Sequence, residues 1–142
     1  MGEAFAATDL TGMQELSEDL CFALLKRPGV GILALCGVEA PVLRPVNFAM
    51  RGKEIVVRTG EGQILAAAQG MEPASFVVTA VDPFEHTGHS VVISGHLRQL
   101  APCPTVEDLP LRPWARAPKH HFVVLTVDEI SGRRIDPSQG AD

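Results

Sequence analysis

Basic residues are scarce in this sequence, and nowhere do they cluster. Its 142 residues include 12 Lys and Arg against 17 Asp and Glu, which gives a formal net charge of −5. The densest basic stretch is Gly132–Arg134, which holds only two arginines. A nucleic-acid-binding domain normally carries a basic patch on its surface. The composition therefore argues against a nucleic-acid partner.

Cysteine is also scarce, and its spacing excludes two classes of small domain. Cys21, Cys36 and Cys103 are odd in number and contain no CxxC pair. A disulfide framework needs paired cysteines, and a structural zinc site needs closely spaced ligands. We therefore expect reduced thiols in a cytoplasmic protein and no metal site. Cys36 is expected to be a small core residue, because it lies in an apolar segment.

Long apolar runs are absent too. No run approaches the roughly 20 residues that a membrane-spanning helix requires. The first twelve residues, MGEAFAATDLTG, lack the apolar segment of a signal peptide. With 46% hydrophobic and 20% charged residues, the chain has a globular composition and no expected membrane association. We predict a flexible arm over residues 1–12, one domain over residues 13–137 and a tail over residues 138–142.

Short apolar segments separated by glycine and proline predict a mainly β (α+β) fold. Helical periodicity is confined to residues 14–27 and 62–70, with a short helix expected at 106–109. Helices do not alternate with strands as parallel crossovers require, so we predict a small antiparallel barrel with flanking short helices. Gly95 marks an expected bulge or close approach. Five predicted strands cover residues 30–37, 41–50, 54–59, 74–81 and 89–100, and residues 120–135 form a sixth strand and a terminal extension.

One stretch, IVVRTGEGQILAAAQ over residues 55–69, has the residue types of a phosphate site. A strand ends at Arg58 and Thr59, two glycines follow, and an alanine-rich helix begins. Guanidinium donors, a hydroxyl and a helix start all favour an anion. The alternative is a strand arginine before an ordinary turn. Gln63 stands where a lysine would suit a phosphate better, and the missing charge would weaken binding by about 1.5–3 kcal/mol.

Four motifs together resemble a known family. RPVNFAM, VVRTGEGQ, TGHSVVISGHL and LPLRPWARAPKHHFVVLTVDEISGRRI occur in the order seen in pyridoxamine 5'-phosphate oxidase-like proteins, most closely the short actinobacterial members. The resemblance covers residues 16–135. It implies a split β-barrel, an obligate homodimer, and FMN or a deazaflavin held at the dimer interface. Some relatives bind haem or no cofactor, so these alternatives stay open.

The resemblance also implies roles for particular residues. The strand-to-helix segment would hold the cofactor phosphate, the second strand would lie against the flavin ring, and the partner chain would contribute a tryptophan. The cofactor-binding residues implied in this way are Arg58, Thr59, Gln63, Ile64, Pro45, Val46, Asn47, Phe48, Ser90 and Trp114. The sequence departs from the family pattern at Gln63, where relatives carry lysine, and at His89, where GHS replaces GWS.

His89 is the candidate catalytic residue. Histidine titrates near neutral pH, so His89 is suited to donate a proton near a substrate. A solvent-facing or internally paired histidine is the plainer interpretation, and a haem ligand is a third. No HxH or HExxH pattern joins the five histidines of the chain.

Two functions follow from these observations. The first is an FMN- or deazaflavin-dependent oxidoreductase that acts on an unidentified small molecule, with the cofactor supplying the redox chemistry. The second is a cofactor-independent protein of the same fold, which binds a small metabolite or catalyses a non-redox biosynthetic step. Fold alone does not separate them. Asn47 is informative, because a polar residue in an apolar strand is either paired internally or directed at a ligand.

Overall fold

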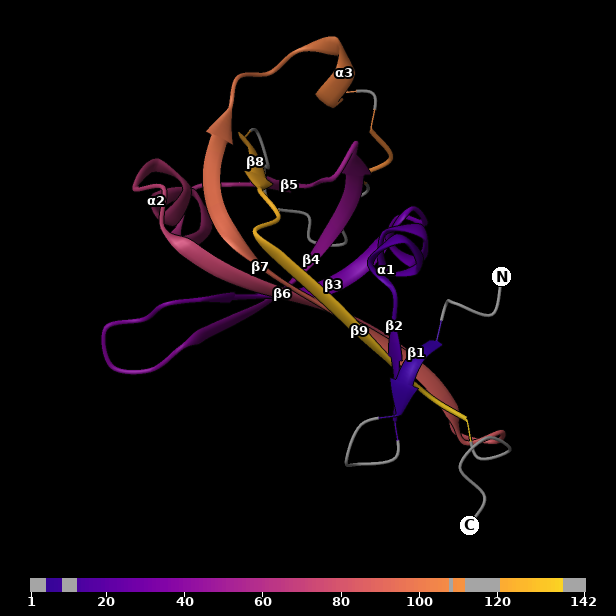
Figure 1. The fold of residues 1–142 in the computed structure, drawn as a ribbon. Helices are drawn as coiled ribbons and strands as arrows, with labels where there is room; N and C mark the ends of the chain where they lie inside the picture. The colour runs from indigo at the N-terminus through magenta and orange to yellow at the C-terminus, as the bar shows by residue number, and fades with distance from the viewer. Residues whose placement is uncertain (1–4, 9–12, 108, 112–120, 137–142) are drawn as a thin grey trace.

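The computed structural model of the chain describes residues 5–8, 13–107, 109–111 and 121–136, most of which form strands (Figure 1). The strands are β1 (Phe5–Thr8), β2 (Gln14–Leu16), β3 (Gly29–Leu35), β4 (Val42–Arg51), β5 (Glu54–Thr59), β6 (Pro73–Asp82), β7 (Thr87–Leu100), β8 (His121–Leu125) and β9 (Glu129–Ile135). The helices are α1 (Glu18–Leu25), α2 (Gln63–Gln69) and α3 (Pro104–Glu107). None of the helices described is long and apolar enough to cross a membrane.

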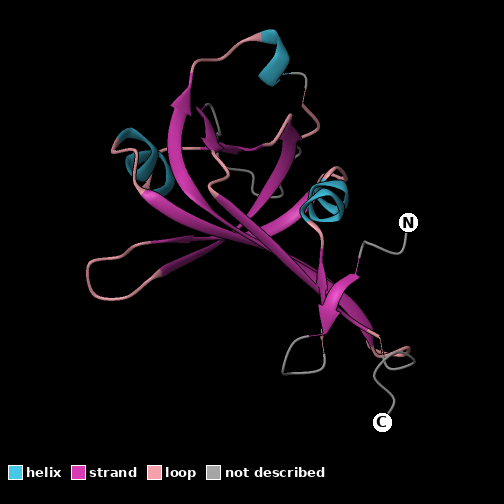
Figure 2. Ribbon diagram, viewed as in Figure 1, coloured by secondary structure: helices cyan, strands magenta, loops and turns pink. Residues whose placement is uncertain are grey.

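Six strands close into a barrel. In hydrogen-bonding order the ring runs β3, β4, β5, β8, β7, β6 and back to β3. Each pairing in the ring is antiparallel. The short helices lie outside the ring of strands (Figure 2). The predicted mainly β fold with a six-stranded antiparallel barrel is confirmed.

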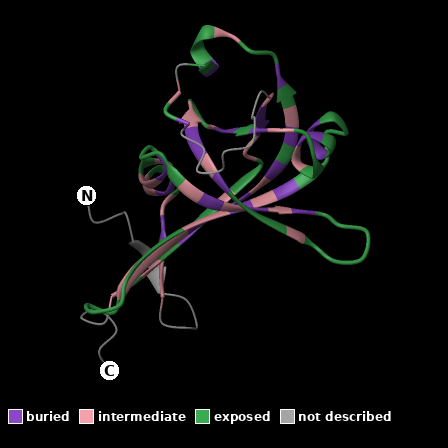
Figure 3. Ribbon diagram, turned by 180° about the vertical axis from the view of Figure 1, so that it is seen from behind, coloured by how far each residue is buried: buried purple, intermediate pink, exposed green. Residues whose placement is uncertain are grey.

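The remaining strands extend the sheet beyond the barrel. β9 pairs with the first half of β7, β2 pairs with β9, and β1 pairs with β2. This extension points away from the ring together with the turn that joins β6 to β7 (Figure 1). Buried residues concentrate in the ring, whereas β2 and β9 are mostly intermediate or exposed (Figure 3). The extension therefore has little core of its own.

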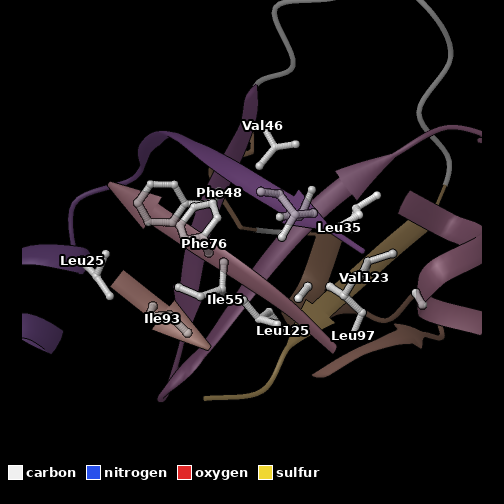
Figure 4. Close-up of a cluster of buried hydrophobic side chains, with 14 of the residues drawn as sticks. Leu25, Leu35, Val46, Phe48, Ile55, Phe76, Ile93, Leu97, Val123 and Leu125 are labelled. Atoms are coloured by element: carbon white, nitrogen blue, oxygen red, sulfur yellow. The ribbon is translucent and has the colours of Figure 1, made fainter. Parts of the chain in front are cut away.

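The interior of the barrel is apolar. Phe48 and Phe76 meet edge to face, with ring centroids 5.1 Å apart, at the centre of the larger cluster (Figure 4). Leu25 joins this cluster from α1, and Leu65 joins it from α2. A smaller cluster on the outer face packs Val56 and Phe122 against α3. In β4, β5, β7 and β8 the residues of the two clusters thus lie on opposite faces of the strand, as the period of a strand requires.

The two longer helices are placed by local sequence. Ser17 caps α1, because its hydroxyl accepts a hydrogen bond from the Leu20 N–H at 3.2 Å. α2 begins after Gly62, whose φ of 145° favours glycine. The buried alanines of α2 let it lie close against β7 and β8. α2 therefore brings Gln63 to one end of the barrel.

Two glycines set the register of the strands. Gly52, with φ of 61°, begins the two-residue turn between Arg51 and Glu54 that joins β4 to β5. At Gly95 a Cβ atom would lie 1.6 Å from the Thr126 carbonyl oxygen. The predicted close approach at Gly95 is confirmed. β8 and β9 pair with the same edge of β7, and the chain between them holds one extra residue there, a bulge, since Leu97 pairs with Leu125 but Ser94 pairs with Glu129.

Residues 120–135 were predicted as a sixth strand and a terminal extension, and they form β8 and β9, which pair with the same edge of β7 on either side of the bulge at Gly95. One prediction of local structure is wrong. Leu16 was assigned to a helix, but it lies in β2 because Ser17 starts α1. β1 lies within the segment predicted as an arm.

The cysteines were also partly misassigned. Cys36 is exposed, because it follows the last residue of β3 and lies on the face opposite to that of buried Leu35. Cys21 is the fully buried cysteine, and burial raises the pKa of its thiol, with the nearby Glu18 carboxylate adding to the shift. All three cysteines are free thiols.

Candidate functional site

β4 changes partner at Phe48. Residues Val42 to Phe48 pair with β3, whereas Phe48 to Arg51 pair with β5. Among the described strands, none pairs with the other edge of Val42–Asn47, and we call this segment the open edge of β4. An unpaired strand edge presents backbone N–H and C=O groups to whatever lies beside it. The open edge therefore offers backbone donors and acceptors to a ligand.

A pair of side chains bridges the gap beside the open edge. The guanidinium of Arg44, on β4, donates from Nη2 to Oε1 of Gln63 at 2.5 Å. A second nitrogen, Nη1, donates to the carbonyl oxygen of Leu43 at 3.0 Å. Both Arg44 and Gln63 are exposed. Position 63 itself carries no cation, but Arg44 of β4 places a positive charge next to the Gln63 side chain.

Arg58 and Thr59 lie on opposite faces of β5. Arg58 is exposed, and its guanidinium carbon lies 5.5 Å from the centroid of the Phe122 ring. Thr59 is 8% exposed and has the same facing as Val57 in the barrel interior. Adjacent strand residues face opposite ways, so the two side chains do not form one joint grip. Arg58 remains the cationic residue at the end of β5.

The loop between β5 and α2 is held by a histidine. His121, which lies opposite Thr59 on β8, has its Nε2 atom 3.0 Å from Oε1 of Glu61. The amide nitrogen of Gln99 lies 3.4 Å from Nδ1 of the same ring. Because an amide nitrogen only donates, Nδ1 is the acceptor in that pair, and Nε2 donates to the Glu61 carboxylate. His121 therefore links the one carboxylate of the loop to β8.

The predicted ring-facing segment divides into two sets of side chains. Val46 and Phe48 are 9% and 1% exposed and point into the barrel cluster (Figure 4). Pro45 and Asn47 alternate with them and face outward, Pro45 exposed and Asn47 half-buried. A ligand beside this segment would meet the backbone of β4 and the Asn47 amide rather than the Phe48 ring.

The other predicted site residues are dispersed. Ile64 packs against the barrel cluster as a partly buried residue. Ser90 and His89 lie in the extension, paired with β6 and β9. Trp114 falls outside the described residues. Leu100, the last residue of β7, pairs with Phe122 of β8, and Phe122 in turn pairs with Arg58 of β5.

The distance along β7 separates His89 from the loop. Ser90 precedes Leu100 by ten residues, which is roughly 33 Å of extended strand. Within one chain, His89 and Ser90 therefore do not share a site with Gln63. His89 instead lines a groove of about 470 Å³, together with Arg134 and the leucines of α1.

A comparison with protein families decides the membership of the chain. The family model described as "Pyridoxamine 5'-phosphate oxidase" matches residues 17–134. The chain belongs to this family. In a comparison with curated protein sequences, none matches the chain.

Solved structures share the fold. An FAD-binding protein from Mesorhizobium loti is 18% identical, with a TM-score of 0.73 over 87% of this chain and 99% of that one. An FAD-binding protein from Mycobacterium smegmatis is 24% identical, with a TM-score of 0.67 over 87% and 98%. An FAD- and haem-binding protein from the same organism is 24% identical, with a TM-score of 0.61 over 82% and 70%. At these identities the likeness shows the fold.

Sequence reasoning missed three residues of this region: Arg44, Glu61 and His121. Arg44 had a usable signal. The turn at Gly52 sets the register Arg51↔Glu54 and Phe48↔Val57. Continued by four residues on each strand, this register brings Arg44 opposite Glu61, close to Gln63. His121 had no such signal, because its place beside Glu61 depends on the pairing of β5 with distant β8.

Proposed function

We propose that the chain is a flavin-dependent oxidoreductase that binds FMN as a homodimer and acts on a small molecule. The observation that carries this proposal is the open edge of β4, where Arg44 bonds to Gln63 at the start of α2, together with Arg58 near the end of β5. The open edge has the backbone groups that a heterocyclic ring can engage, and its neighbours have the donors that a phosphate requires.

The phosphate would lie beside the loop of residues 60–62. Arg58 and Gln63 lie on either side of this loop in sequence, near the end of β5 and at the start of α2. Glu61 would repel an anion if it pointed inward, but it is held by His121. Holding Glu61 at the β8 side therefore keeps the approach to Gln63 open.

The ring would lie along the open edge. Pro45 and Asn47 are the side chains of this edge that face outward, so they would contact the ring. Phe48 and Val46 would act indirectly, because their packing in the core fixes the backbone that the ring meets. FMN, when bound, supplies the capacity to accept or donate a hydride, and these residues bind and orient it.

The dimer is part of the proposal because His89 and Ser90 lie too far along β7 to serve the site of their own chain. In the proposed homodimer the extension of one chain would complete the site of the other, and His89 would donate a proton to the substrate. Exposed apolar residues on both regions, Leu43 at 60% and Val81 at 73%, support a contact between copies. Light scattering of the purified protein tests this, and a monomer would contradict the shared site.

The decisive experiment is a visible absorption spectrum of the purified protein, recorded before and after incubation with FMN and desalting. We expect a retained yellow flavin band. A Soret band would indicate haem instead, and a retained deazaflavin would change the cofactor but not the reaction class. A protein that stays colourless and retains none of these would contradict the proposal and favour a cofactor-independent function.

A further inference from the structure

We propose that the groove beside His89 binds a small organic anion with an apolar body, such as a medium-chain carboxylate, and that Arg134 binds its charged group. The groove has a volume of about 470 Å³, which is within the usual range of small-molecule sites. Binding in the groove does not require a flavin. That this anion is the substrate rests on the proposed function, in which His89 donates a proton to the substrate.

Two neighbouring strands build the polar end of the groove. His89 of β7 pairs with Arg134 of β9, so the two side chains lie next to each other on one face of the sheet. On the other side of His89 is Ala80 of β6, whose small side chain leaves room beside the imidazole. A guanidinium has a planar fork of donors that matches a carboxylate, and an imidazole has at least one N–H donor. The pair therefore suits a carboxylate group.

The apolar wall of the groove comes from α1 and from the strand before it. Leu20 and Leu24 are four residues apart in α1, so they lie on one face of the helix. Both are partly buried against the barrel cluster, and Leu16 of β2 also lines the groove. Because α1 contacts both β9 and β7, this wall lies directly beside the polar end. A ligand with one charged end and a hydrocarbon body matches both parts of the groove.

Two carboxylates near the groove limit the charge of the ligand. Asp82 accepts hydrogen bonds through Oδ1 from the N–H groups of Phe84 at 3.0 Å and Glu85 at 3.1 Å. Asp136 Oδ2 lies 3.6 Å from Arg134 Nη2, which is longer than a hydrogen bond, so a ligand carboxylate that approaches to about 2.8 Å would bind the guanidinium more strongly. The same two carboxylates would repel a doubly charged group. We therefore expect a singly charged carboxylate to be preferred to a phosphate.

The test is an NMR titration of the full-length protein with sodium octanoate, with 1-octanol as the uncharged comparison. Octanoate should shift the backbone amide signals of His89 and Arg134 in a saturable manner. Arg134→Gln should weaken octanoate binding on the order of 10- to 100-fold, since a charge-assisted contact is lost, and should leave octanol binding unchanged. The matched control is Arg133→Gln, which removes the preceding arginine of β9, on the opposite face, and should change neither affinity.

Further variants separate the two parts of the groove. Leu24→Ala should weaken octanoate and octanol by the same factor, because it shortens the wall that both hydrocarbon chains contact. Arg134→Lys, which keeps the charge but not the planar fork, should lose less octanoate affinity than Arg134→Gln. Octyl phosphate should bind the unmodified protein more weakly than octanoate does. Tighter binding of octyl phosphate would contradict the preference for a single charge.

The outcomes distinguish this inference from the proposed function. If octanoate binding depends on Arg134 but the protein retains no flavin, the groove is a binding site and the proposed function falls. If flavin is retained but octanoate shifts neither amide, or binds no more tightly than octanol, the inference is wrong. A second copy of the chain that covers the groove would give that same result. If octanoate binds the flavin-loaded protein and leaves the flavin absorption band unchanged, the anion is not the substrate.

Discussion

β4 and β7 each pair with one strand and then with another along their length. The two points at which the partner changes are held by different kinds of hydrogen bond. β4 passes from β3 to β5 at Phe48, and β7 passes from β9 to β8 next to Gly95. At Gly95 the segment that joins β8 to β9 stays bonded to the edge of β7 through the backbone, with Thr126 N–H donating to the His96 carbonyl at 3.0 Å. Beside the open edge of β4, the bridge is the side-chain bond from Arg44 to Gln63.

The difference indicates which of the two points is available to a ligand. Backbone bonds at Gly95 are reinforced by Asp128 N–H, which donates to the Ser94 carbonyl at 2.9 Å, and by Thr126 Oγ1, which accepts from His96 N–H at 3.2 Å. Opening the sheet at Gly95 would break these backbone hydrogen bonds. At the open edge of β4, rotation of the exposed Arg44 and Gln63 side chains is enough to admit a ligand. We therefore expect the bulge at Gly95 to govern stability and the open edge to govern binding.

The largest expected effect on stability is at Phe48, where β4 pairs with both β3 and β5. Phe48→Ala would remove a fully buried ring that packs on Phe76, which should lower the free energy of unfolding by about 3–5 kcal/mol. Asn47→Ala, on the adjacent outward-facing position, should cost less than about 1 kcal/mol. Urea denaturation of the two variants checks this. Similar losses for both would show that the two faces of β4 are not divided between core and site.

Gly95→Ala is expected to have the next largest effect. The added Cβ atom would lie 1.6 Å from the Thr126 carbonyl oxygen, a backbone atom that can move only if the bulge between β8 and β9 moves. We expect a loss of at least about 1–3 kcal/mol, the usual range for overpacking. Gly52→Ala is the control, because a Cβ atom there meets nothing within 4 Å and the loss reflects only its φ of 61°. Thermal unfolding that ranks Gly52→Ala as the more damaging would contradict the role of Gly95.

Much of the fold was predictable from the sequence, because each strand is a short apolar run bounded by turn residues. Gly52 and Gly95 were informative for a physical reason: one needs a positive φ and the other needs space for a neighbouring backbone. The bulge between β8 and β9 was not predictable from periodicity. It depends on how this segment pairs with distant β7, which is a tertiary property.

The candidate site was less predictable than the fold. Arg58, Thr59 and Gln63 form one segment in sequence, but strand alternation turns Thr59 inward and leaves Arg58 outward. Arg44 lies 19 positions from Gln63 and joins it through the register of a hairpin. His89 lies in the extension, so its relation to the site depends on a second chain. Local patterns therefore identified the loop but not its partners.

Thr126→Val should have a smaller effect than Gly95→Ala. The substitution removes the hydroxyl that accepts from His96 N–H and donates to the His96 carbonyl, while the backbone bond of residue 126 stays. Loss of such hydrogen bonds at a partly exposed position should lower the free energy of unfolding by about 0.5–1.5 kcal/mol. Hydrogen exchange at the His96 amide gives a local readout. An unchanged exchange rate would show that the hydroxyl does not stabilise the bulge between β8 and β9.

The smallest expected effect on stability is that of Arg44→Gln, and it sharpens the comparison most. Arg44 and Gln63 are both exposed, so their bond should contribute less than about 1 kcal/mol to the free energy of unfolding. If the open edge serves binding, this variant should unfold with the same urea midpoint as the unmodified protein in the absence of flavin. Added FMN should then raise the midpoint of the unmodified protein more than that of the variant, because a ligand stabilises in proportion to its affinity. A lower midpoint without flavin would mean that the Arg44–Gln63 bond stabilises the barrel, as the backbone hydrogen bonds at Gly95 do. The open edge and the bulge at Gly95 would then not differ in their roles.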